Sequence, residues 1–145
     1  DAEPQRVVSL IDRDPAFGTD RMTSALLDFG DNRHLNFTVS TQLTPYQRIH
    51  LVGTKKRLEI VIPFNAPQGE AVQIRLDDGS LLGDAAMQSD IIAPCDQYAE
   101  LADVFGRAIT GEAPLPYGAE DAVQNMKILD AIFASAEKDG WVSIG

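Results

Sequence analysis

The sequence has 145 residues and a mass of 15.8 kDa, a size that suits one domain. Hydrophobic residues make up 44% of it and charged residues 23%, which is typical of a globular protein and excludes an intrinsically disordered one. Because 22 Asp and Glu outnumber 12 Lys and Arg, the net charge of −10 disfavours binding to nucleic acid or to an anionic membrane.

Hydrophobic alternation predicts strands over most of the first 92 residues. The segments that carry it are 6–13, 22–29, 34–40, 48–52, 57–62 and 72–77, with a short seventh around 90–92. In 34–40, Leu35, Phe37 and Val39 alternate with polar residues, which is typical of an antiparallel strand with one buried face. Turn residues at 30–32 and 53–56 predict hairpins between neighbouring strands.

The hydrophobic period changes to three and four residues in the last third of the chain. A first helix is expected from Tyr98 to Ile109, with Asp96 as its N-cap and Gly111 as its stop. A longer helix is expected over 119–139, followed by a short edge strand within 141–144. The stripe expected to be buried on the longer helix is Ala122, Met126, Leu129, Phe133 and Ala136.

Strands followed by two helices predict an α+β fold. We expect two layers, a largely antiparallel open sheet with two helices packed on one face, in a single domain that spans residues 1–145. The other face of the sheet is then available for a partner or a ligand.

Motifs for several kinds of chemistry are absent from the sequence. There is no G-x-G-x-x-G, no P-loop and no G-x-S-x-G, so we assign no catalytic or cofactor-binding residue. One cysteine and two histidines cannot form a His/Cys zinc site, and no metal site is assigned. We interpret His34 and His50 as solvent-facing or interface residues, and Cys95 as a small buried residue at a strand-to-helix junction.

The lone cysteine also excludes an intrachain disulfide, and nothing in the sequence signals secretion. No apolar run approaches the ~18 residues that a membrane span needs. We therefore expect a cytoplasmic location.

One segment, 40–48, is dense in hydrogen-bonding side chains and carries one aromatic ring. Its sequence, Ser-Thr-Gln-Leu-Thr-Pro-Tyr-Gln-Arg, joins two predicted strands. Such side chains suit a sugar or polyol site, whereas the alternative is a polar connection that meets only water. The sequence leaves both interpretations open.

The order of several short motifs resembles the C-terminal domain of the Gfo/Idh/MocA oxidoreductases. The motifs are Thr41-Gln42-Leu43, Pro45-Tyr46-Gln47-Arg48, Val52-Gly53-Thr54-Lys55, Leu58-Glu59-Ile60, Ile62-Pro63-Phe64-Asn65-Ala66-Pro67, Asp96-Gln97-Tyr98 and the closing helix from Glu120 to Glu137. The likeness covers about residues 7–144. It departs from the family at Lys56, where members usually have glycine, so this lysine must either adopt an unfavourable positive φ or use another type of turn.

The resemblance implies a substrate-binding and oligomerisation domain of an NAD(P)-dependent enzyme that acts on a sugar, an inositol or a related polyol. It implies that an N-terminal Rossmann domain, absent from this sequence, binds NAD or NADP and supplies the catalytic lysine of an E-K-P motif. On this view, this chain alone is inactive and forms a homodimer or higher oligomer through the open sheet face. Tyr46 matches a region where some members place a substrate-facing tyrosine, and Gln42 is its expected hydroxyl-binding neighbour.

The sequence also leaves an alternative from another class. A stand-alone, non-catalytic α+β binding or dimerisation module would show the same absence of catalytic motifs. A small enzyme of a different kind is disfavoured, because no nucleophile and base can be named.

Overall fold

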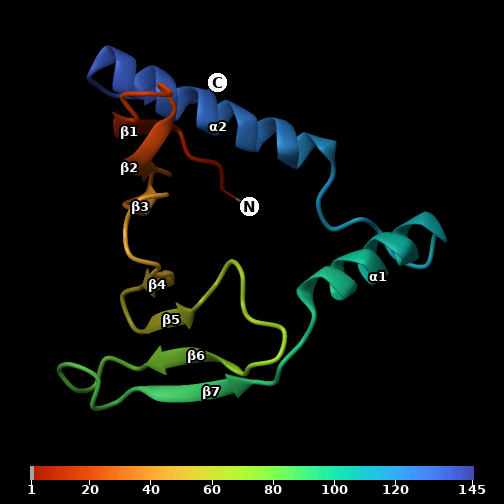
Figure 1. The fold of residues 1–145 in the computed structure, drawn as a ribbon. Coiled ribbons are helices and arrows are strands. Elements are labelled where there is room, and N and C mark those ends of the chain that lie inside the picture. Colours follow the sequence, from red (N-terminus) through yellow and green to blue (C-terminus); the bar gives the residue numbers. More distant parts are fainter. Residues whose placement is uncertain (1) are drawn as a thin grey trace. The chain divides into compact units, whose positions relative to one another are not determined.

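The computed structural model describes residues 2–145 and divides them into two compact units (Figure 1). The first contains the residues up to 44 together with 116–145, and the second contains residues 45–115.

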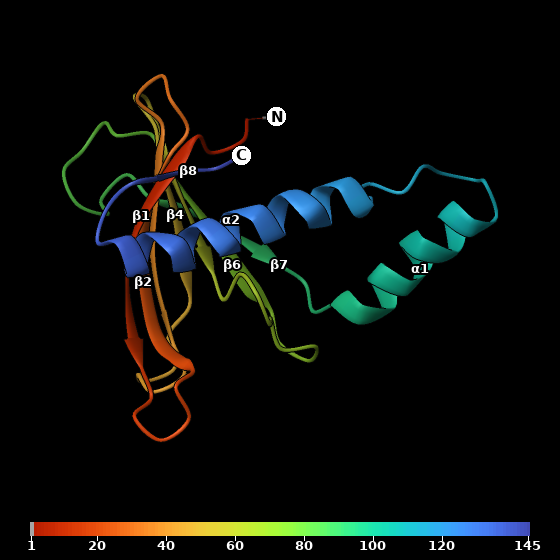
Figure 2. The same ribbon diagram turned by 90° about the horizontal axis from the view of Figure 1, so that it is seen from above.

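The first unit is an antiparallel sheet with one helix. Its strands are β1 (Arg6–Arg13), β2 (Asp20–Asp28), β3 (His34–Ser40) and β8 (Val142–Ser143), in the spatial order β3-β2-β1-β8. The helix α2 (Ala119–Lys138) packs on β1. The two ends of the chain lie side by side, since the Ile144 N–H donates to the Gln5 carbonyl at 2.9 Å (Figure 2).

The core of the first unit lies between α2 and one face of this sheet. Its buried apolar residues are Val7, Ala25, Leu27, Ala131 and Ile132. The positions that alternate with them along β1 and β2 face away from α2, as the two-residue period of a strand requires. This second face of the sheet stays open.

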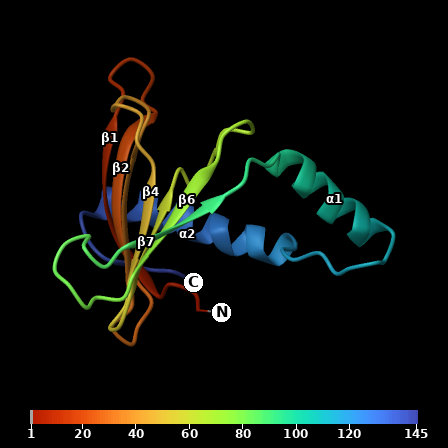
Figure 3. The same ribbon diagram turned by 90° about the horizontal axis from the view of Figure 1, so that it is seen from below.

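The second unit is a meander of four antiparallel strands and one helix. The strands are β4 (Arg48–Val52), β5 (Arg57–Val61), β6 (Val72–Asp77) and β7 (Gln88–Ile92), and they pair in sequence order (Figure 3). The helix α1 (Gln97–Ile109) follows β7 in the chain. The Asp96 carboxylate caps α1 by accepting the Tyr98 and Ala99 N–H groups at 2.9 and 3.2 Å.

The predicted α+β class with antiparallel, open sheets and two helices is confirmed. Two details differ from the expectation. The strands form two sheets of four instead of one, and none of the residues of α1 is buried.

The buried stripe expected on the longer helix is wrong. The residues of α2 that are buried are Ala131, Ile132 and Ser135, about one residue out of phase with the expected stripe. Apolar side chains such as Val123 and Met126 also occur on the exposed surface of α2. Because the contact with β1 includes a serine, hydrophobicity alone selects the wrong face.

The structure also decides two smaller points, the burial of Cys95 and the turn at Lys56. Cys95 is exposed and not buried, since it lies in the irregular segment between β7 and α1. Lys56 does not adopt a positive φ, so of the two possibilities left by the sequence its hairpin uses the other type of turn, closed by the Gly53 N–H donating to the Lys56 carbonyl at 2.9 Å.

Candidate functional site

The segment that the sequence marks as a candidate site lies between β3 and β4 and has no regular structure. Gln42 belongs to the first unit and Tyr46 to the second. The two residues are therefore placed separately, each by contacts within its own unit.

Gln42 lies just beyond the end of β3. The Ser40 hydroxyl accepts the Gln42 backbone N–H at 3.0 Å and donates to the Arg21 carbonyl of β2 at 2.8 Å. These bonds fix the backbone at Gln42, while its exposed carboxamide makes only a long 3.4 Å contact with the Thr41 hydroxyl. The polar end of the Gln42 side chain is thus free to meet a ligand.

Tyr46 is 74% exposed, yet its ring is held in place from one side. The Arg48 guanidinium carbon lies 5.1 Å from the centre of the Tyr46 ring, within the range of a cation–π contact. The opposite face of the ring is accessible. Tyr46 therefore presents a flat aromatic surface and a hydroxyl group.

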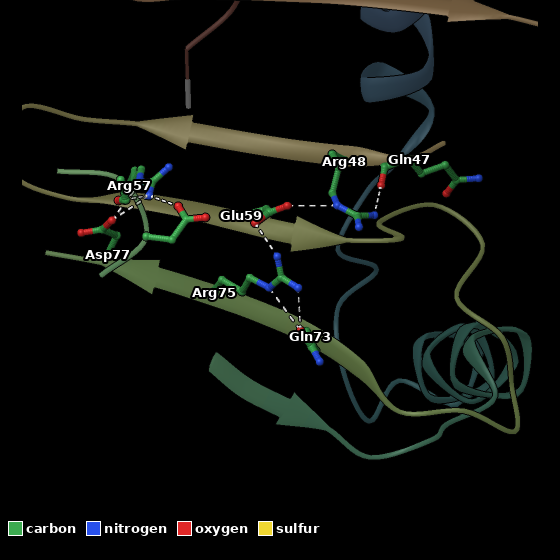
Figure 4. A network of polar contacts seen from close by, with 9 residues as sticks. Gln47, Arg48, Arg57, Glu59, Gln73, Arg75 and Asp77 are labelled. Carbon is green, nitrogen blue, oxygen red and sulfur yellow. Dashed lines mark hydrogen bonds and ion pairs between the residues drawn. The ribbon is translucent and has the colours of Figure 1, made fainter. Parts of the chain in front are cut away.

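Arg48 is itself anchored by a chain of ion pairs across the sheet (Figure 4). It donates to Glu59 on β5 at 3.0 Å and to the Gln47 carbonyl at 2.7 Å. The other Glu59 oxygen lies 3.2 Å from Arg75 on β6, and Arg75 also donates to Gln73. The network spans three strands, so the cation beneath Tyr46 is held by well-ordered partners.

Gln47 lies between Tyr46 and Arg48 in the sequence, and its side chain contacts the loop that follows β5. Its carboxamide nitrogen donates to the Asn65 side-chain oxygen, and its oxygen accepts the Phe64 N–H at 3.4 Å. Gln47 thus ties the segment before β4 to a loop 18 residues further along the chain.

A second charged group lies at the far end of β5. Arg57 donates to Asp77 at 2.8 Å, to Asp84 at 2.6 Å and to the Gly83 carbonyl at 2.7 Å. The pKa of Asp77 lies below its ordinary value, chiefly because the carboxylate accepts the Gly79 N–H and secondly because it accepts from Arg57. The pKa of Arg57 is raised, chiefly by its hydrogen bond to Asp84 and secondly by its hydrogen bond to Asp77. These contacts order the loop between β6 and β7.

Both histidines are exposed on strands. His34 is on the open face of the first sheet with its Nε2 3.9 Å from Asp28, and His50 is exposed on β4 opposite Glu59. Both positions agree with the surface positions expected from the sequence.

The sequence singles out Gln42 and Tyr46 as candidates but gives no sign of the residues that contact them. The alternation of Arg57 and Glu59 on one face of β5 was visible, but pairing Glu59 with Arg48 and Arg75 requires the strand register. The Gln47–Asn65 contact has no local signal, because both residues lie in irregular segments.

The first unit also contains an apolar hollow of about 400 Å³. It lies between α2 and strands β2 and β3, and its walls include Leu27, Phe37, Ile128 and Leu129. Neither Gln42 nor Tyr46 lines this hollow, and its polar groups are limited to Glu3 and Asn125.

The helix N-termini of this chain do not fit a dinucleotide. A pyrophosphate binds where free backbone N–H groups and the helix dipole meet it. In α1 the Asp96 carboxylate already accepts two of these N–H groups, those of Tyr98 and Ala99, and the first turn of α2 carries Glu120 and Asp121. Among residues 2–145, no group of three or more His, Cys, Asp or Glu side chains is arranged to hold a metal ion.

No helix within the part of the chain that the structure describes is long and apolar enough to cross a membrane.

Comparison with known proteins adds to this description. Residues 2–144 match the family model of the Gfo/Idh/MocA oxidoreductases described as "Oxidoreductase family, C-terminal alpha/beta domain". The chain is 41% identical over 143 residues to an uncharacterized oxidoreductase of Rhizobium meliloti, covering 99% of this chain and 43% of that protein. It is 28% identical over 144 residues to a D-xylose 1-dehydrogenase (NADP(+)) of Haloferax volcanii, covering 97% of this chain and 42% of that protein.

Solved structures share the fold at low sequence identity. The aldose-aldose oxidoreductase from Caulobacter crescentus, complexed with glycerol, superposes with a TM-score of 0.75 at 17% identity, over 98% of this chain and 42% of that one. The 3-ketoreductase KijD10 from Actinomadura kijaniata, in complex with TDP-benzene and NADP, gives 0.78 at 17% identity, over 92% and 41%. This chain spans less than half the length of the curated relatives that it matches.

Proposed function

Because the chain belongs to the Gfo/Idh/MocA oxidoreductase family by its C-terminal α/β domain, we propose that it binds the substrate of an NAD(P)-dependent enzyme. The substrate is a sugar, an inositol or a related polyol. The 145 residues form the substrate-binding and oligomerisation domain, and Tyr46 and Gln42 contact the substrate.

The observation that carries this proposal is the Tyr46 ring, exposed on one face and held over Arg48 on the other. The C–H-bearing face of a sugar ring packs on an aromatic face, while the hydroxyl groups around it need donors and acceptors. Tyr46 offers both an aromatic face and a hydroxyl, and the free carboxamide of Gln42 offers a donor and an acceptor. Because Arg48 is fixed by Glu59, little ordering of the aromatic surface is required on binding.

The names of the relatives support a sugar or polyol as the substrate. The Haloferax relative is a D-xylose dehydrogenase that uses NADP(+), and the fold neighbours include an aldose oxidoreductase and a 3-ketoreductase crystallised with NADP. The resemblance noted from residues 7–144 is confirmed at the level of the family.

The nicotinamide cofactor is proposed to bind outside these residues. The acidic helix N-termini of α1 and α2 do not fit its pyrophosphate, so no step of the reaction is assigned to this chain. We expect residues 1–145 alone to be inactive, the complete enzyme to use NAD or NADP, and the protein to be cytoplasmic.

A second copy of the chain is proposed to bind the open face of the first sheet. Exposed apolar side chains gather there, among them Leu10, Met22 and Leu26. Exposed apolar patches on a sheet face commonly mark an interface with another chain.

The test uses the protein as its gene encodes it, assayed with NAD⁺ and NADP⁺ against D-xylose, D-glucose, D-galactose and myo-inositol. Tyr46→Ala removes the aromatic face and is expected to raise KM about tenfold, whereas Tyr46→Phe keeps that face and is expected to raise it less. Tyr117→Ala is the matched control, since Tyr117 is a similarly exposed tyrosine in the first unit. An unchanged KM in Tyr46→Ala would remove Tyr46 from the site.

The alternative, a stand-alone, non-catalytic binding or dimerisation module, makes a different prediction for the same assay. The encoded protein would then oxidise or reduce no compound of the panel in the presence of either cofactor. Turnover of any substrate in the panel excludes that alternative.

A further inference from the structure

The loop after β5 has an unusual backbone. Ile62 has a φ of +55°, in the left-handed region that β-branched residues rarely adopt, and it directly precedes Pro63. Residues held in this region persist where surrounding contacts enforce them, and such places are concentrated at functional sites. Two and three residues further along this loop, Gln47 contacts the Phe64 N–H and the Asn65 side chain.

Gln47 determines which way the Asn65 side chain is turned. Its oxygen accepts the Phe64 N–H at 3.4 Å, so the other end of its carboxamide must be the NH₂ group. That NH₂ group donates to the side-chain oxygen of Asn65. The Asn65 NH₂ group is therefore the end that remains, and it has no partner among residues 2–145.

Asn65 is joined through Gln47 to the segment that carries Tyr46. Asn65 is exposed, its neighbour Phe64 is 66% exposed, and Gln47 is the residue that follows Tyr46 in the chain. One carboxamide thus links the segment that carries the aromatic surface to a loop that carries a free hydrogen-bond donor.

We propose that Asn65 is a further substrate-contact residue, which donates a hydrogen bond from its NH₂ group to an oxygen of the sugar, and that Gln47 is its positioning residue. This inference rests on the proposed function of Tyr46. It specifies that the protein supplies the donor of this hydrogen bond. At Asn65 the ligand must therefore offer an acceptor, which is a hydroxyl, ether or carbonyl oxygen.

Two variants test the two parts separately, in the protein as its gene encodes it. Asn65→Asp keeps the oxygen that Gln47 contacts but replaces the donor with a carboxylate oxygen. Gln47→Glu keeps an acceptor for the Phe64 N–H but has no donor for Asn65, so the Asn65 carboxamide turns over and presents its oxygen to the ligand. Gln68→Glu, in the same loop and exposed, is the control for an added negative charge.

KM and kcat are measured with the aldose of the panel that the wild type turns over fastest. Asn65→Asp and Gln47→Glu are each expected to raise KM about tenfold while kcat stays within about twofold. Gln68→Glu is expected to change neither. In ¹⁵N spectra, adding D-xylose is expected to shift the Asn65 side-chain amide signal of the wild type and not that of Gln47→Glu.

The outcomes separate this inference from the function on which it rests. If Tyr46→Ala raises KM and Asn65→Asp does not, the contact at Asn65 is wrong while the sugar site stands. If Asn65→Asp raises KM and Gln47→Glu does not, Gln47 is not the positioning residue. If no variant changes KM, or the wild type binds no sugar, both proposals are overturned.

Discussion

Ser135 on α2 supplies a hydrogen bond that the sheet cannot. Strand β8 pairs with β1 only at Arg6 and Val7, so the Ser9 N–H further along β1 has no strand to meet on that side. The Ser135 hydroxyl accepts this N–H at 2.9 Å and donates to the Gly140 carbonyl at 2.7 Å. In return, the Ser9 hydroxyl donates to the Ile132 carbonyl at 2.6 Å, so the buried contact between helix and strand is polar on both sides.

Ser135→Ala is expected to lower the free energy of unfolding by about 1–3 kcal/mol, because it leaves the buried Ser9 N–H without an acceptor. Urea denaturation followed by circular dichroism measures the loss. Ser89→Ala, at an exposed position on β7, is the control and is expected to stay within about 0.5 kcal/mol. A similarly small loss in Ser135→Ala would mean that water satisfies the Ser9 N–H.

Asp77 makes stability depend on pH at the acid end. The Gly79 N–H and then Arg57 lower the pKa of Asp77 in the folded state, so in the window below about pH 4 the unfolded chain binds more protons than the folded one. The stabilisation is therefore complete above that window and is lost as pH falls through the folded-state pKa. Asp28 and Asp78, whose pKa values are also lowered, act in the same direction.

Asp77→Asn is expected to flatten the acid limb of a plot of unfolding free energy against pH from 6 to 2. The variant should also be less stable than the wild type near neutral pH, because Arg57 loses one of its two charged partners and keeps only Asp84. Asp90→Asn on β7 serves as the comparison, since Asp90 is exposed and makes no ion pair within residues 2–145. An acid limb as steep as that of the wild type would place the dependence on other carboxylates.

The residues of the candidate site show where prediction from sequence reaches its limit. Gln42 and Tyr46 are candidates from the sequence because local composition marks a polar segment with an aromatic ring, and their contact with a substrate stays a prediction. The Gln47–Asn65 pair and the Ser9–Ser135 pair join residues 18 and 126 positions apart, and nothing in the local pattern of either partner signals the other. Side-chain contacts of this kind follow from the packed fold and not from periodicity.

At the scale of helices and strands, local patterns were far more informative. Two-residue alternation located the strands of both sheets, and the Asp96 cap and the following stripe located α1. Alternation could not show that β3 and β4 belong to different sheets, because a sheet boundary depends on which strands pair. The face of α2 was also misassigned, since the buried contact with β1 includes Ser135.

The end of α2 is strained and can be improved. Asp139 closes the helix with a φ of +52°, a conformation that glycine adopts without steric cost. Asp139→Gly is expected to raise the free energy of unfolding by about 0.5–1 kcal/mol, measured by urea denaturation. Asp139→Ala removes the charge but keeps the Cβ atom, so it should give no such gain. Equal gains in both variants would assign the effect to the charge at the helix end instead.

At the scale of the whole molecule, the open face of the first sheet is the surface through which two copies of the chain are expected to meet. Val8, Leu10, Met22 and Leu26 point away from α2, and Leu10 is 74% exposed at the middle of β1. Among them lies the Ser24 hydroxyl, which is opposite Leu10 and is hydrogen-bonded to the Thr38 hydroxyl at 2.8 Å. Apolar side chains interspersed with satisfied polar groups suit a contact with another protein surface.

Leu10→Glu is therefore expected to weaken self-association of the chain at least about tenfold, because a carboxylate buried in the contact would have no partner. Sedimentation velocity over a range of concentrations measures this as a shift from dimer to monomer. Phe17→Glu provides the control: Phe17 is as exposed as Leu10 but lies in the turn after β1, so its replacement lowers surface hydrophobicity without charging the open face. If the wild type sediments as a monomer throughout, or if both variants weaken association equally, the open face is not the surface through which two copies meet.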